Sequence, residues 1–202
     1  MILVLGIGNV LWADEGFGVR SVERLHARWD LGDDVRVMDG GTQGVYLVPY
    51  VTESRKVLVF DAVDFGDEPG TIRVARGEDV PKFMGCSAMS LHQVGFQDVL
   101  AAADLLGKAP EAITLVGVQP HTLEDYGGGL TDVVAARVDE AIEIALAELR
   151  GWGVLPRTRA RPAEPILADV IGRAAYEGGR PSADEACRIG DPRFLPRAGE
   201  EG

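Results

Sequence analysis

The chain has 202 residues, 46% of them hydrophobic, which is enough for one well-buried core and too few for two full domains. Its formal net charge of -12 argues against nucleic acid or an anionic membrane surface as a partner, because both require a basic footprint. Cys86 and Cys187 cannot form a disulfide framework and neither lies in a Cys-x-x-Cys pair, so a reducing cytoplasm is the expected compartment.

Apolar, strand-like runs alternate along the chain with amphipathic stretches, which is the pattern of an open α/β sheet with mainly parallel strands. No basic leader precedes the first run, so a signal peptide is not expected. We predict strands at 2–7, 34–38, 56–62 and 112–118, with 71–75 as a candidate edge strand. We predict helices at 15–28, 43–51, 91–106 and 131–150. Near-continuous hydrophobicity in three of the strands implies helices on both faces, and therefore a three-layer α/β/α sandwich around an open sheet of about five strands.

The last predicted helix and the segment after it differ sharply in composition. An apolar stripe at helical spacing marks the helix and consists of Val134, Val138, Ala141, Ile142, Ala145 and Leu149. Beyond Gly151 lie six of the eleven prolines, and eight Arg there balance eight Asp or Glu, so the excess of negative charge belongs to residues 1–150. We therefore expect one α/β domain over 1–155 and a Pro- and Arg-rich tail over 156–202, loosely attached and partly disordered, with a short helical pattern at 166–177.

Polar residues follow several of the predicted strands, and in open parallel sheets ligands bind beyond the carboxyl ends of the strands. Glu15 follows the first strand, Asp39 ends the second and Asp61 ends the third. His92 lies at the start of the helix at 91–106. The chemistry of the protein is therefore expected at one edge of the sheet.

Three of these residues, Glu15, Asp61 and His92, form a candidate metal site. Carboxylate oxygen and imidazole nitrogen together suit divalent zinc, nickel, manganese or iron, and three protein ligands leave coordination positions open for water or a substrate group. Ser90 and Gln93 resemble a capping box that places His92 in a first helical turn, where the macrodipole keeps the imidazole neutral. Glu15 gains from the same effect if Asp14 caps the first helix.

Each residue also has an ordinary structural explanation, and two other kinds of site compete. An acid is favoured in a first helical turn without any ligand, Asp61 could cap a turn, and a single His is more often a satisfied surface or core residue. A dinucleotide site is suggested by Gly6-x-Gly8, but Leu11 stands where the third glycine is needed. A Ser90 or Cys86 nucleophile near His92 lacks a Gly-x-Ser-x-Gly elbow or an activating base of its own.

At these same positions the sequence resembles the maturation endopeptidases of nickel–iron hydrogenases. The resemblance covers about residues 1–150 in the order of the family's motifs, while the segment after about 156 extends past the shared core. The matching stretches are Leu-Gly-Ile-Gly-Asn-Val-Leu at 5–11, Asp-Glu-Gly-Phe-Gly-Val-Arg at 14–20, Asp-Gly-Gly-Thr at 39–42, Asp-Ala-Val at 61–63, Ser-Leu-His-Gln-Val-Gly at 90–95 and Leu-Val-Gly-Val-Gln-Pro at 115–120.

The resemblance implies an activity as well as a fold. Family members remove a short C-terminal peptide from the nickel-loaded large subunit of the hydrogenase, with metal ligands that correspond to Glu15, Asp61 and His92 here. Nickel is expected to arrive with the large-subunit precursor, and another divalent metal could occupy the site in isolation. Either the metal or a nearby acid activates water, and Asp39 is the candidate for that acid, as in an aspartic-type endopeptidase. A chaperone that binds nickel or the large subunit without cutting it is the alternative.

Overall fold

The computed structural model describes residues 1–85, 91–123 and 129–166, with the side chains of residues 83–94 outside the described part. At its centre lies a five-stranded sheet with the strand order β3-β1-β4-β6-β5. Its strands are β1 (Ile2–Ile7), β3 (Val35–Gly41), β4 (Lys56–Ala62), β5 (Ile72–Arg76) and β6 (Ala112–Val118). Four of them run parallel, and β5 joins the edge antiparallel to β6. This confirms the mainly parallel sheet and the edge strand predicted from the sequence.

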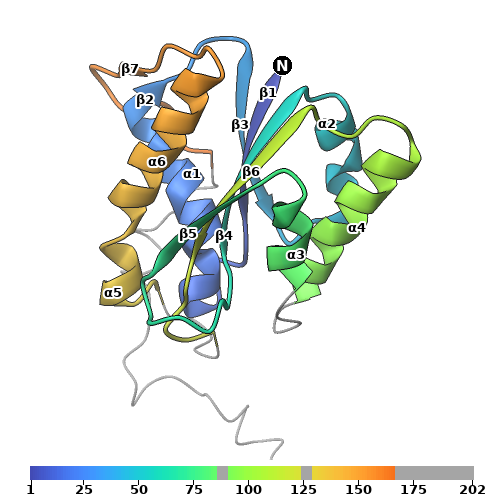
Figure 1. Ribbon diagram of the computed structural model, residues 1–202. Helices are drawn as coiled ribbons and strands as arrows, with labels where there is room; N and C mark the ends of the chain where they lie inside the picture. Colours follow the sequence, from blue (N-terminus) through green and yellow to red (C-terminus); the bar gives the residue numbers. More distant parts are fainter. Residues whose placement is uncertain (86–90, 124–128, 167–202) are drawn as a thin grey trace, which may run out of the picture.

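Helices cover both faces of the sheet, which confirms the three-layer sandwich (Figure 1). One face carries α1 (Phe17–Arg28), α5 (Asp132–Ala135) and α6 (Val138–Gly151). The other carries α2 (Val48–Thr52), α3 (Asp79–Gly85) and α4 (Leu91–Leu105). The predicted apolar stripe of the last helix is buried, from Val134 to Leu149. Every helix within the described ranges is too short or too polar to span a lipid bilayer.

Three short elements were not predicted from the sequence. Helix α3 has Pro81 in its first turn, where a proline is tolerated, and Val80 anchors it in the core. Strands β2 (Trp29–Asp30) and β7 (Arg157–Thr158) form a separate antiparallel pair. Segments of this length carry too little periodicity to be recognised before their partners are known.

Helix α1 lies unusually close to the sheet because glycine occupies the contact. A Cβ atom on Gly18 would lie 2.2 Å from the carbonyl oxygens of both Ile7 and Phe60. No other residue allows the backbone of α1 to approach β1 and β4 to this degree. Gly18 therefore fixes the start of α1 directly against the ends of the two central strands.

The beginning of the predicted tail is bound to the domain. β7 pairs with β2, and Nε of Arg159 donates hydrogen bonds to the carbonyl oxygens of His26 (3.2 Å) and Trp29 (3.0 Å) at the end of α1. The guanidinium thus satisfies carbonyl groups that a helix end leaves unpaired. Residues 157–163 are attached more firmly than their composition predicted, whereas most of the helical pattern at 166–177 lies outside the described residues.

Two buried serines give opposite expectations for stability. The hydroxyl of Ser21 on α1 has no hydrogen-bond partner among the described residues, whereas the hydroxyl of Ser54 donates to the carbonyl oxygen of Tyr50 at 2.7 Å. Ser21→Ala is expected to raise the free energy of unfolding by about 1 kcal/mol, because it removes an unsatisfied buried group and improves helix propensity. Ser54→Ala is expected to lower it by about 1 kcal/mol. Urea denaturation of both variants measures the difference, and a loss of stability in Ser21→Ala would contradict the assignment.

Candidate active site

The candidate site lies where β1 and β4 end. After β1 the chain passes through α1 on one face of the sheet to β3, and after β4 it passes through α3 and α4 on the other face to β6, so β1 and β4 flank a topological switch point. Loops that diverge from such a point leave a crevice at the carboxyl ends of the strands. Glu15 follows β1 and Asp61 lies at the end of β4, so the two residues belong to the two strands that flank this point.

Glu15 is carried by a 3-10 turn, η1 (Ala13–Gly16), between β1 and α1. The turn is pressed against Gly8, whose φ is 128° and whose Cβ, if present, would lie 1.8 Å from the carbonyl oxygen of Glu15. The N–H of Glu15 donates to the carbonyl oxygen of Trp12 at 2.9 Å. Burial raises the pKa of the Glu15 carboxyl from 4.5 to about 7. Near neutral pH this group is therefore poised between its acid and its carboxylate.

Asp61 is the next-to-last residue of β4, and it is 0% exposed to solvent. Burial raises the pKa of its carboxyl well above the usual value, and the negative charge of Glu15 raises it further, while the N–H of Ala62 lowers it. The two carboxyl groups are therefore close enough to repel each other. A pair of this kind is stabilised by a cation that binds both.

His92 lies in the first turn of α4, as predicted, although its side chain is outside the described part. A Cβ on Gly95, one turn later, would lie 3.3 Å from Cα of Gly44 in η2 (Gly44–Leu47), the turn that follows β3. The N-terminal end of α4 is thus at the same edge of the sheet as Glu15 and Asp61 (Figure 1). The capping residue Ser90 and the alternative nucleophile Cys86 lie outside the described residues.

Asp39 is in β3, the neighbour of β1, but its surroundings differ from those of Asp61. Its carboxylate accepts a hydrogen bond from the N–H of Gly41 at 2.8 Å, which shapes the turn after the strand. Burial raises the pKa of Asp39, while the Gly41 N–H and the charge of Arg20 on α1 lower it. Arg20 is itself only 6% exposed and pairs with Glu23 at 3.1 Å. Asp39 thus has a structural role in its turn, and its role in catalysis stays a prediction.

Asp14 differs from its neighbour Glu15 in burial and in its hydrogen-bond partners. It is 0% exposed, and its carboxylate accepts hydrogen bonds from the N–H groups of His121 (2.9 Å), Thr122 (3.1 Å) and Thr131 (2.7 Å). The predicted N-cap role of Asp14 is wrong, because Gly16 occupies the N-cap of α1 and the Asp14 carboxylate points to the connection between β6 and α5. No local pattern indicates this role, since the partners of Asp14 are more than a hundred residues away along the chain.

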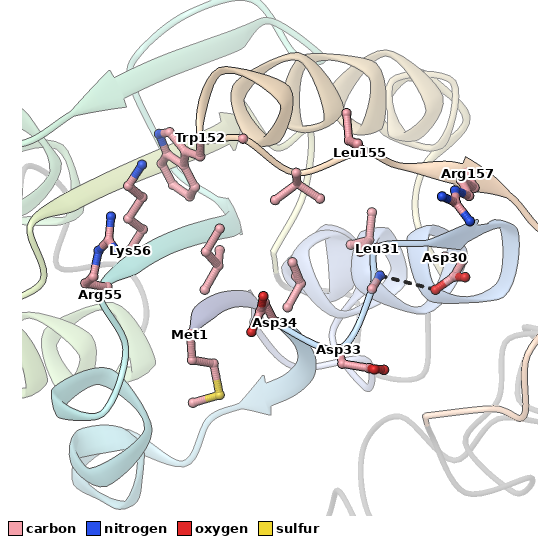
Figure 2. Close-up of a pocket in the computed structure, with 15 residues that line it drawn as sticks. Met1, Asp30, Leu31, Asp33, Asp34, Arg55, Lys56, Trp152, Leu155 and Arg157 are labelled. Atoms are coloured by element: carbon pink, nitrogen blue, oxygen red, sulfur yellow. Dashed lines mark hydrogen bonds between the residues drawn. The ribbon is translucent and has the colours of Figure 1, made fainter.

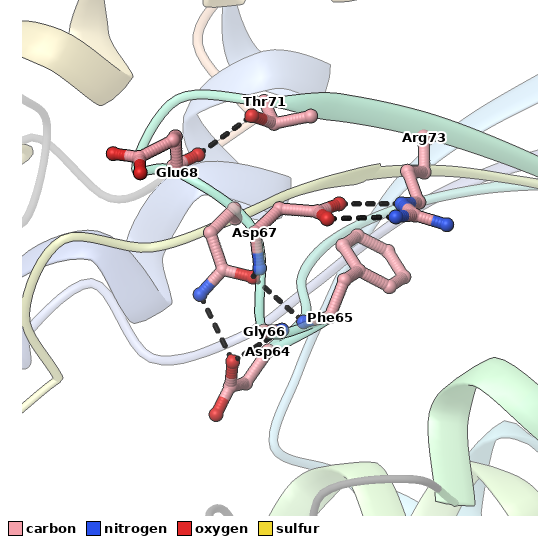
Figure 3. Close-up of polar contacts among 8 residues, drawn as sticks. Asp64, Phe65, Gly66, Asp67, Glu68, Thr71 and Arg73 are labelled. Atoms are coloured by element: carbon pink, nitrogen blue, oxygen red, sulfur yellow. Dashed lines mark hydrogen bonds and ion pairs between the residues drawn. The ribbon is translucent and has the colours of Figure 1, made fainter.

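Gln119, directly after β6, organises the loop that follows β4, in which Figure 3 shows Asp64, Phe65 and Asp67. Its Oε1 accepts hydrogen bonds from the N–H groups of Phe65 (2.7 Å) and Asp67 (3.2 Å), and its Nε2 donates to Asp64 at 3.0 Å. In the same loop Asp67 pairs with Arg73 at 2.7 Å. Gln119 belongs to the stretch 115–120 that carries the family resemblance, but that stretch does not indicate which loop the Gln119 side chain binds.

A cavity of about 550 Å³ lies at the opposite end of the sheet and contains none of these residues (Figure 2). Its walls include Met1 and Lys56 at the beginning of the central strands and Trp152 after α6. Among the side chains that the structure describes, which include His26 and His121, no group of three or more His, Cys, Asp or Glu could hold a metal ion. His121 is thus not part of such a group with Glu15 and Asp61, and the role of His92 stays a prediction.

The raised pKa of Glu15 predicts how stability depends on pH. Between about pH 4.5 and pH 7 the folded chain binds more protons than the unfolded chain, so the free energy of unfolding falls as the pH rises through this window. Glu15→Gln removes this contribution and is expected to gain on the order of 1 kcal/mol relative to wild type at pH 7.5 but little at pH 4.5, after allowance for screening by solvent. Urea denaturation at both pH values tests this, and an equal effect at the two would show that Glu15 titrates normally.

Comparison with known proteins shows the family to which the chain belongs. The family model described as hydrogenase maturation protease matches residues 19–148. The chain is 56% identical over 197 residues to the hydrogenase expression/formation protein HupD of Rhodobacter capsulatus, a match that covers 98% of this chain and 94% of that protein. This match includes most of the segment after residue 156, whereas the family model ends at residue 148, so the segment is shared with this relative but lies outside the core that the family model matches.

Escherichia coli proteins extend the similarity to solved structures. The hydrogenase 2 maturation protease of strain K12 is 43% identical over 159 residues, covering 77% of this chain and 96% of that protein. The structure of the hydrogenase maturating endopeptidase HybD from E. coli matches with a TM-score of 0.75 and 42% identity, covering 79% of this chain and 98% of that one. From the agreement of the fold with these matches, we conclude that the chain belongs to the hydrogenase maturation protease family.

Proposed function

We propose that this protease removes a short C-terminal peptide from the precursor of a nickel–iron hydrogenase large subunit, in the cytoplasm, after nickel has been inserted. The nickel is part of the substrate, and Glu15, Asp61 and His92 are its proposed ligands from this chain. Another divalent metal would take the same place in the isolated protein. Membership of the family supports the protease activity, and the site supports the use of a cation.

The observation that carries this proposal is the pair formed by the fully buried carboxyl group of Asp61 and the half-buried carboxyl group of Glu15 at the switch point. Asp61 is fully buried and its pKa is raised by burial and then by Glu15, whose own pKa is about 7. Without a cation, two such groups cannot both ionise at low cost. A divalent ion bound by oxygen and imidazole nitrogen would stabilise both carboxylates and leave positions for the ligands that the precursor supplies. The donor set therefore fits nickel that arrives in the substrate.

Positioning is the main contribution expected from the chain. Ligands on η1, β4 and α4 would fix the metal, and with it the scissile peptide bond, against the edge of the sheet. Asp39 would act as in an aspartic-type endopeptidase and accept a proton from the attacking water. This role requires the carboxylate form of Asp39. The Gly41 N–H and Arg20 favour that form against the effect of burial. Water then adds across the peptide bond, leaving a carboxylate on the mature subunit and an amine on the released peptide.

Mass spectrometry of the precursor tests the proposal. Incubation of nickel-loaded precursor with the protein is expected to remove a short C-terminal peptide, and nickel-free precursor is expected to keep its mass. His92→Ala is expected to abolish cleavage. His26→Ala is the matched control, because His26 lies at the far end of α1 and should leave cleavage intact. An unchanged precursor mass together with a stable complex would instead support a chaperone that binds without cutting.

A further inference from the structure

The carboxylate of Asp14 binds both ends of the connection between β6 and α5, and its contacts with His121, Thr122 and Thr131 are called the Asp14 clasp. At the beginning of this connection, Oδ2 accepts hydrogen bonds from the N–H groups of His121 and Thr122 at 2.9 and 3.1 Å. At its end, Oδ1 accepts hydrogen bonds from the N–H of Thr131 at 2.7 Å and from the Thr131 hydroxyl at 3.0 Å. The N–H of Asp14 also donates to the carbonyl oxygen of Thr122 at 3.3 Å. The clasp thus joins three segments through one fully buried carboxylate.

The clasp acts on the turn that carries Glu15, because Asp14 and Glu15 are consecutive in η1. From the side of β1, Gly8 limits this turn by direct contact with the backbone of Glu15. From the side of β6, Asp14 is the anchor. Both contacts therefore act on the backbone of η1 at or next to Glu15.

A buried carboxylate is costly unless charge-assisted hydrogen bonds satisfy both of its oxygens, as they do here. An apolar residue could fill the same space without needing the backbone of two distant segments to converge on it. Unlike an apolar residue, the carboxylate makes directional contacts, because three N–H groups and a hydroxyl hold it in one orientation. This is the behaviour of a residue that sets geometry for its neighbour.

We propose that Asp14 is a positioning residue for the cleavage reaction, which holds Glu15 in place by locking η1 to both ends of the connection between β6 and α5. The inference rests on the proposed function, in which Glu15 binds the metal of the precursor. Misplacement of a ligand by about 1 Å costs on the order of 100-fold in rate, so loss of the clasp should appear mainly in kcat.

Steady-state kinetics with nickel-loaded precursor test this inference. The variants remove more or fewer of the contacts of Asp14, and each is measured under conditions in which it is folded. Asp14→Asn keeps the shape but loses acceptors, and kcat should fall about 100-fold with a smaller change in KM. Thr131→Val removes only the hydroxyl and should lower kcat about 10-fold, and Thr131→Ser should restore it to within about 2-fold. Leu146→Ala, in the core of α6, is the control for lost stability and should keep the wild-type kcat. Wild-type kcat in Asp14→Asn, or an equal loss in Leu146→Ala, would overturn the inference.

A second measurement separates this inference from the proposed function. If wild-type protein leaves the precursor uncut, the proposed function fails, and amide hydrogen exchange then tests the clasp directly. Thr131→Val is expected to accelerate exchange of the Glu15 N–H, which donates to Trp12, by about 10-fold or more relative to wild type, because η1 opens when the clasp loosens. Unchanged exchange at Glu15 in both Thr131→Val and Asp14→Asn would show that the clasp does not hold the turn.

Discussion

Asp61→Asn is expected to lower cleavage of the nickel-loaded precursor by about 100-fold or more while raising the stability of the chain. The side chain is fully buried, and burial together with Glu15 raises its pKa, so the ionised form is costly to the folded protein. As the pH rises above the usual pKa of an aspartate, the unfolded chain releases this proton before the folded chain does. The free energy of unfolding therefore falls. A neutral amide removes that cost and is expected to gain about 1 kcal/mol at pH 7.5.

Asp67→Asn provides the matched control for Asp61→Asn. Asp67 pairs with Arg73 at 2.7 Å, and this pair lowers the pKa of Asp67 (Figure 3). The charged form is therefore the favoured one, so this variant should lose a little stability at neutral pH and keep full cleavage. Precursor cleavage and urea denaturation of both variants are measured together. Full activity in Asp61→Asn would remove Asp61 from the site, and lost stability would contradict its costly ionisation.

Gly8→Ala is the second change with a large expected effect. The added Cβ would lie 1.8 Å from the carbonyl oxygen of Glu15, and φ of 128° is unfavourable for alanine. Relief requires η1 to move away from β1, which carries Glu15 with it. We expect a loss of about 3 kcal/mol of stability and a fall in cleavage of about 100-fold in the protein that remains folded.

Gly66→Ala separates backbone strain from displacement of the turn. Gly66 also has a positive φ, 72°, but a Cβ there would meet nothing within 4 Å. This variant should lose about 1 kcal/mol through strain and keep its activity. Cleavage per folded molecule is the deciding measurement. If Gly8→Ala and Gly66→Ala have the same activity, the close contact between Gly8 and Glu15 does not position the site.

The sequence predicted the central strands well because their burial is encoded locally. The predicted bounds 2–7, 56–62 and 112–118 agree with β1, β4 and β6, since strands covered on both faces are continuous apolar runs. β3 extends to Gly41, beyond the predicted 34–38, because its last residues pair with the end of β1. That pairing depends on a partner, which periodicity alone cannot reveal.

What the sequence determined by itself is the sheet, its helical layers and the edge at which polar residues gather, because apolar periodicity and strand-end position are local properties. What only the tertiary structure decided is the role of each polar residue at that edge. Asp14 and Glu15 are adjacent acids, yet the first accepts hydrogen bonds from backbone groups of the distant connection after β6, and the second has its pKa raised to about 7 by burial and raises the pKa of Asp61 by its charge. Burial and hydrogen-bond partners set the state of a carboxyl group, and both arise from residues far away in the sequence.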